Sequence, residues 1–77
     1  MKYPQYRKLK DRAYYKIVSE TELFEMQKLG KRYVLIHLVA HTFVDRNFIS
    51  DLLNGDNGRY EEIMEVEYES VAKTKLD

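Results

Sequence analysis

RYVLIHLVAHTF, residues 32–43, is the stretch on which the expected fold depends. Alternate side chains of an extended chain share a face, and both faces of this stretch are largely apolar. A strand of this kind is typical of the interior of a sheet that is covered on both sides. One face holds Tyr33, Leu35, His37, Val39, His41 and Phe43, and the other holds Val34, Ile36, Leu38, Ala40 and Thr42. We therefore predict a central strand, with His37 near the middle of the sheet.

A helix is the alternative for this stretch. His37 and His41 are four residues apart, as in a zinc-protease helix, and a helix would place both on one face. No capping residue precedes the stretch, and it is rich in β-branched residues, which favours a strand. Four residues of strand span roughly 13 Å, whereas zinc–nitrogen bonds are about 2 Å. Leu38 also stands where the catalytic glutamate of the zinc motif would be. We expect two polar strand positions of interest, no metal site and no cofactor.

VSETEL, residues 18–23, predicts the start of a helix before this strand. Ser19 and Glu22 have the spacing of a capping box, in which each side chain bonds the backbone N–H of the other residue. The apolar residues at either end of VSETEL would form a hydrophobic staple, and Gly30 suits the position after a helix. The pattern predicts a helix from Glu20 to Leu29.

AYYKIV, residues 13–18, is rich in aromatic and β-branched residues and predicts a strand. QYRKL, residues 5–9, is its expected hairpin partner, with the turn near residues 10–12. The length of the loop between these two strands decides the register, which stays open, because an even-length loop would mix the two sets of side chains given next. An odd-length loop would place Tyr6, Lys8, Tyr14 and Lys16 on one face and Leu9, Ala13, Tyr15 and Ile17 on the other.

The sequence of the second half of the chain predicts a further helix, whereas its last segment fits either a strand or a helix. Asp45 can cap a helix over RNFISDLL, residues 46–53, which Asn54-Gly55 ends before a turn at residues 56–58. A weak echo between YYKIVSETELFEMQK and RYEEIMEVEYESVAK favours a strand over residues 59–63 and a helix over residues 65–75. One long strand from Glu62 to Lys73 is the alternative.

Together these elements predict one α+β domain over residues 1–77, with residues 1–12 as a basic N-terminal arm or an edge strand. The sheet would have three or four strands, and two or three short helices would pack on it. The expected core consists of Ile17, Val18, Leu23, Met26, Val34, Ile36, Leu38, Phe48, Ile49, Leu52 and Ile63.

Composition narrows the classes of function. The chain has no cysteine, so disulfides and thiolate chemistry are excluded. No apolar run is long enough to span a bilayer, and the basic start lacks the apolar core of a signal peptide. We expect a cytoplasmic protein. Neither a glycine-rich phosphate loop nor a glycine-flanked nucleophile is present, which predicts a protein that is not an enzyme.

Charge is unevenly spread although the formal net charge is zero. The first sixteen residues hold six basic side chains and one acid, interleaved with tyrosines. Basic side chains neutralise phosphates and tyrosines stack on unpaired bases, so single-stranded nucleic-acid binding is the alternative function. Its residues would be Arg7, Lys8, Lys10, Arg12 and Tyr14.

The leading hypothesis is a protein-interaction or regulatory module that self-associates. Its basis is the excess of apolar surface on residues 33–43 for so short a chain. A small domain has a thin stability margin, and association is a common way to bury more surface. A protein partner or a homodimer is expected, with C₂ as the default symmetry.

Overall fold

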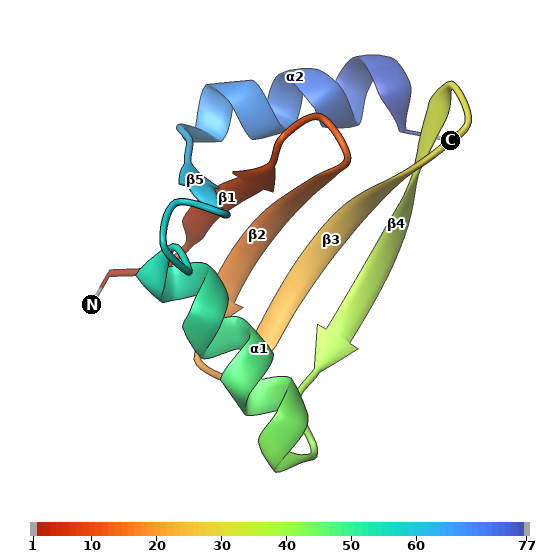
Figure 1. Ribbon diagram of the computed structural model, residues 1–77. Helices are drawn as coiled ribbons and strands as arrows, with labels where there is room; N and C mark the ends of the chain where they lie inside the picture. Colours follow the sequence, from red (N-terminus) through yellow and green to blue (C-terminus); the bar gives the residue numbers. More distant parts are fainter. Residues whose placement is uncertain (1, 77) are drawn as a thin grey trace.

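The computed structural model describes residues 2–76 and has an α+β architecture (Figure 1). The strands form a single antiparallel sheet in the order β4-β3-β2-β1-β5, which is one strand more than the upper expectation. The two helices agree with the sequence-based expectation. In chain order the elements are β1 Gln5–Leu9, β2 Ala13–Ser19, β3 Glu22–Leu29, β4 Arg32–Val39, α1 Phe43–Asn54, β5 Glu61–Glu62 and α2 Glu65–Lys75.

Strands β1 and β2 form the expected hairpin. Leu9 pairs with Ala13, so the loop has an odd length, and Lys10 takes a positive φ of 50° within it. The odd register is therefore the correct one of the two open alternatives. β1 is not an edge strand, because it lies between β2 and the two-residue β5.

The predicted helix over Glu20–Leu29 is wrong, because this segment is strand β3. The Ser19 hydroxyl accepts the backbone N–H of Thr21 at 3.1 Å and so shapes a tight turn into β3. A capping box is a local signal worth about 1 kcal/mol, which tertiary pairing readily overrides. β3 pairs along its whole length with β4, and Gly30-Lys31 provides the two-residue turn between them. A glycine with φ of 70° at Gly30 suits such a hairpin.

Strand β4 confirms the extended conformation expected for residues 32–39, but it is an edge strand and not a central one. The chain leaves the sheet after Val39 and enters α1, so no later strand returns to this side of β4 within residues 2–76. His37 is consequently exposed at the edge and does not lie at the centre of the sheet.

Both helices lie close to where they were expected. Helix α1 begins earlier, because the Thr42 hydroxyl accepts the N–H of Asp45 at 3.2 Å and is the N-cap in place of Asp45. Gly55 ends α1 with φ of 82°. The short β5 followed by α2 confirms the strand-then-helix prediction for the last segment and excludes one long strand.

The core consists of two clusters, one on each face of the sheet. The α1 face contains a cluster under α1, made of Ala13, Tyr15, Ile17, Leu23, Ala40, Ile49, Leu52 and Tyr60. The α2 face contains a cluster under α2, made of Tyr6, Tyr14, Met26, Tyr33, Ile63 and Tyr68. Figure 1 shows α2 along the end of the sheet that holds the β1–β2 and β3–β4 turns, whereas α1 lies nearer the opposite end. Each helix therefore covers only part of its face.

The core prediction was right for six residues and incomplete for the rest. Ile17, Leu23, Met26, Ile49, Leu52 and Ile63 are buried. Val18, Val34, Leu38 and Phe48 are half-buried, and Ile36 is exposed on the edge strand. Tyrosines fill much of the space instead. Tyr68 of α2 packs on Tyr6, and Tyr60, in the segment between α1 and β5, packs on Tyr15.

Substitution of Met26 tests the second cluster. Met26 is fully buried, so Met26→Ala is expected to lower the free energy of unfolding by about 2–5 kcal/mol through lost contacts and a residual cavity. The exposed neighbour Gln27 provides the control, and Gln27→Ala should change stability by less than about 0.5 kcal/mol. Urea denaturation followed by circular dichroism measures both. Equal effects of the two substitutions would contradict the central place of Met26.

Buried tyrosines predict a loss of stability at alkaline pH. Burial raises the pKa of Tyr68 to about 12 and raises that of Tyr15 further still, from an ordinary value of 10.0. The unfolded chain therefore loses these protons first as the pH rises. The contribution of the neutral hydroxyls is complete below pH of about 10 and is lost as the pH rises through the folded-state values. Unfolding titrations combined with tyrosinate absorbance should show this decline, and native tyrosines that all ionise at the ordinary pKa would contradict it.

Candidate interaction edge

The outer edge of β4 exposes unpaired backbone groups. The Ala40 N–H donates to the Thr21 carbonyl of the neighbouring chain segment at 2.7 Å, so the even-numbered residues of β4 direct their backbone groups toward β3. In an antiparallel ladder the alternate residues then direct theirs outward. Tyr33 agrees with this assignment, because it forms an isolated bridge with Leu76 on the outer side. Beyond Tyr33, no strand within residues 2–76 pairs with the outward groups of Leu35, His37 and Val39.

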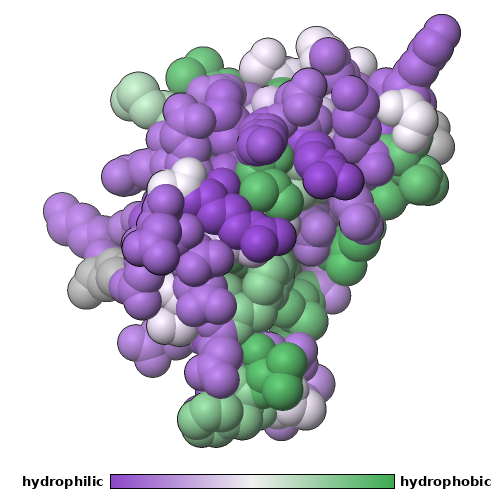
Figure 2. All heavy atoms as spheres, viewed as in Figure 1, coloured by the Kyte–Doolittle hydropathy of each residue, from purple (hydrophilic) through white to green (hydrophobic). Residues whose placement is uncertain are grey.

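The side chains of β4 leave this edge apolar on both faces of the sheet. Leu35 is 52% exposed, Val39 40% and Ile36 39%. Figure 2 shows hydrophobic side chains along the side of the molecule where β4 lies and at the start of α1 below it. Soluble proteins usually protect an edge strand with a lysine, a proline, a bulge or a very short length. β4 has eight residues in continuous register, and residues 33–39 contain neither proline nor a formally charged side chain.

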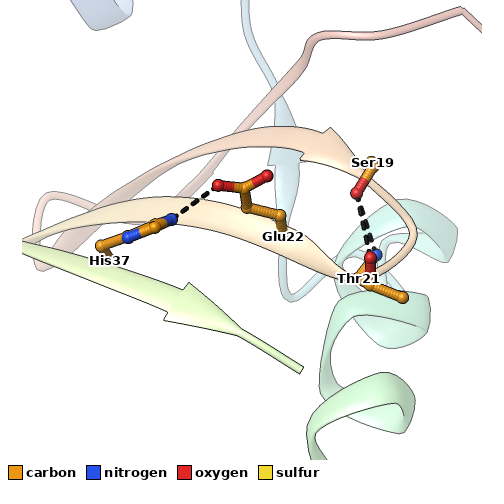
Figure 3. Close-up of polar contacts among 4 residues, drawn as sticks. All are labelled: Ser19, Thr21, Glu22 and His37. Atoms are coloured by element: carbon orange, nitrogen blue, oxygen red, sulfur yellow. Dashed lines mark hydrogen bonds and ion pairs between the residues drawn. The ribbon is translucent and has the colours of Figure 1, made fainter. Parts of the chain in front are cut away.

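Three side chains form a small polar and aromatic group beside this edge. His37 Nε2 lies 2.7 Å from Glu22 Oε2 (Figure 3). The imidazole also stacks on Phe24, with ring centroids 4.5 Å apart and an interplanar angle of 12°. All three belong to the α2 face, outside the cluster that α2 covers. The pair is open to solvent, with the side chains 47% and 39% exposed, so its contribution to stability is small. Together with the Phe24 ring, the pair places the imidazole over β3.

The two histidines are not brought together. His37 is in β4, whereas His41 lies after its end and before α1. Among residues 2–76, no three acidic or histidine side chains converge as metal ligands would.

Of the basic residues that the sequence singled out, Arg7 is buried and has a structural role. Its guanidinium donates to the carbonyl oxygens of Leu52 at 3.0 Å, Leu53 at 3.2 Å and Tyr6 at 2.9 Å. Leu52 and Leu53 lie in the last turn of α1, where a cation is favourable, and the Leu52 carbonyl also accepts the Gly55 N–H at 3.3 Å. β1 therefore supplies the positive charge that the last turn of α1 itself lacks.

The other four residues do not form one surface with Arg7. Lys8 lies on the opposite face of β1 and donates to Glu67 of α2 at 2.9 Å. Tyr14 is buried in the cluster under α2. Lys10 and Arg12 are exposed in the β1–β2 turn. Nucleic-acid binding by this set stays a prediction, and the structure provides no stacking platform at Tyr14.

Two open cavities of about 490 Å³ lie beside the α1 face. One lies between α1 and the β2–β3 turn and is lined by Glu20, Arg46 and Ser50, among others. The other is beside Tyr15 and contains Glu25, whose pKa burial raises above its usual value. No histidine lines either cavity, so neither combines a hydroxyl nucleophile with an imidazole base.

Comparison of the chain with protein-family models, curated proteins and solved structures found no match. Within residues 2–76 no helix is long and apolar enough to cross a membrane. Sequence reasoning identified the apolar stretch but not its edge position, and the Gly30-Lys31 turn was the signal that could have placed β3 beside it.

Substitutions of Arg7 and Arg12 distinguish an arginine with a structural role from one at the surface. Arg7→Lys keeps the charge but loses the planar set of donors, so it is expected to lower the free energy of unfolding by about 1–3 kcal/mol. Arg12 is exposed, and Arg12→Lys should change stability by less than about 0.5 kcal/mol. Thermal and chemical denaturation measure both variants. An Arg7→Lys variant as stable as Arg12→Lys would show that the hydrogen bonds to α1 are dispensable.

Proposed function

We propose that the protein is a non-catalytic interaction module that self-associates by adding a strand at the outer edge of β4. The observation that carries the proposal is the unprotected edge, with outward backbone groups at Leu35, His37 and Val39 and exposed apolar side chains on both faces. Strand addition gains affinity from main-chain hydrogen bonds and specificity from alternate side chains. β4 offers both unpaired main-chain groups and exposed alternate side chains.

The two edges of the sheet support the proposal by their contrast. β5, at the opposite edge, is only two residues long and consists of the exposed acids Glu61 and Glu62. Short length and charge are the usual means of preventing edge-to-edge pairing. The chain therefore protects one edge of its sheet and leaves the other accessible.

The distribution of charge along the β3–β4 hairpin favours a second copy of the chain as the partner. The turn end of the hairpin carries Lys28, Lys31 and Arg32. The other end, with the start of α1, carries Glu20, Glu22 and Asp45 against Arg46. An antiparallel pair of β4 strands brings the basic end of each copy to the acidic end of the other, which is electrostatically complementary. A parallel pair would place like charges together.

A lysine at the edge tests the proposal. Val39→Lys places a charge on the pairing strand, so it is expected to raise the dimer dissociation constant at least about tenfold, or about 1.4 kcal/mol. Val66 of α2 is 72% exposed and lies outside β4, so Val66→Lys is the matched control and should associate as the native chain does. Sedimentation equilibrium over a range of protein concentrations measures all three, and circular dichroism checks that each is folded.

A native chain that stays monomeric at millimolar concentration would refute self-association. Equal association of the Val39→Lys and Val66→Lys variants would refute the assignment to β4.

A further inference from the structure

We infer that two copies pair through β4 in an antiparallel register whose two-fold axis passes beside His37. This inference rests on the proposed function and specifies the interface that it needs. Three facts determine the register: the positions of the outward backbone groups, the residue that blocks one end of the edge, and the place where the strand ends.

The accessible part of the edge is symmetric about His37. Tyr33 is already bridged by Leu76 on its outer side, and β4 ends at Val39. The outward positions that remain in the strand are Leu35, His37 and Val39. A two-fold axis at His37 pairs Leu35 with Val39 of the second copy and pairs His37 with its own counterpart. All of these are hydrogen-bonded positions of an antiparallel ladder, in which two facing residues exchange both backbone bonds.

Neighbouring registers use this edge less well. An axis at Ile36 would set Tyr33 opposite Val39 of the second copy, where Leu76 already bridges Tyr33. An axis at Leu38 would set Leu35 opposite His41, which lies beyond the end of β4. Only the axis at His37 gives every free outward strand position a strand partner.

Side chains also match in this register. On the α2 face, the exposed Leu35 meets Val39 of the second copy, which buries apolar surface from both copies. The two imidazoles lie side by side at the axis, each held by the Glu22 carboxylate and the Phe24 ring of its own copy. On the α1 face, Ile36 meets Leu38 of the second copy. No lysine, arginine, aspartate or glutamate of the paired strands faces a like charge, because residues 33–39 contain none.

Disulfide formation between single-cysteine variants tests the register, since the native chain has no cysteine to interfere. Directly opposed residues have Cα atoms about 5.5 Å apart, within disulfide reach, whereas a shift of the axis by one residue separates the same pair to about 7–8 Å. His37→Cys is therefore expected to form an oxidised dimer at least about tenfold faster than Val66→Cys, which reports random collision.

A mixture of variants gives an independent readout of the same register. Leu35→Cys alone should oxidise no faster than Val66→Cys, because its two copies would lie roughly 13 Å apart. Mixed with Val39→Cys, it should give the cross-linked heterodimer as the main product, identified by intact mass. Sedimentation of each reduced variant establishes whether it still associates.

The outcomes separate the register from the proposed function. If the reduced variants associate but His37→Cys cross-links no faster than Val66→Cys, the register is overturned and self-association stands. If Leu35→Cys forms the cross-linked heterodimer mainly with His37→Cys and not with Val39→Cys, the axis is at Ile36. The inference is then overturned in favour of that register. If the native chain and all variants remain monomeric, the proposed function fails and the inference fails with it.

Discussion

The fold depends on the ability of β2 and β3 to bury side chains on both faces of the sheet. Ile17 and Leu23 pair on the α1 face and are fully buried, while Tyr14 and Met26 pair on the α2 face beneath the other helix. This two-sided burial requires a cover on each face. α1 and α2 provide it, and each is anchored to β1 by a polar contact, through Arg7 for α1 and through Lys8 for α2.

The chain has too few helices to cover the whole sheet. Each helix covers part of one face, and the α2 cluster reaches β4 only at Tyr33. The far half of β4 therefore keeps an apolar sequence suited to a covered strand, yet Leu35, Ile36 and Val39 stay exposed, whereas Leu38 packs against the cluster under α1. The mismatch between the composition of β4 and its environment is the physical reason that an interface is expected there.

The sequence predicted the elements whose signals are local and dense. The aromatic and β-branched content of residues 13–18 and the Asn54-Gly55 terminus of the helix before it both led to correct assignments. The helix over Glu20–Leu29 failed because Ser19 and Glu22 match a capping box by spacing, while the deciding interactions come from two neighbouring strands. Edge position cannot be read from residues 32–39 themselves, since it depends on where the rest of the chain goes. Similarly, no local pattern indicates that Arg7 would meet carbonyl groups some 45 residues later.

The asymmetry of the two edges also bears on how far self-association can proceed. Open strand edges lead to fibres when each added copy leaves a further accessible edge. Pairing about a two-fold axis consumes the β4 edge of both copies at once. The combined sheet would then end on both sides in β5. This strand is only two residues long, and both of its residues, Glu61 and Glu62, are acidic. Under the proposed pairing, the sequence that leaves β4 accessible would therefore limit assembly through sheet edges to a closed dimer, which would distinguish a specific interface from an aggregation-prone strand.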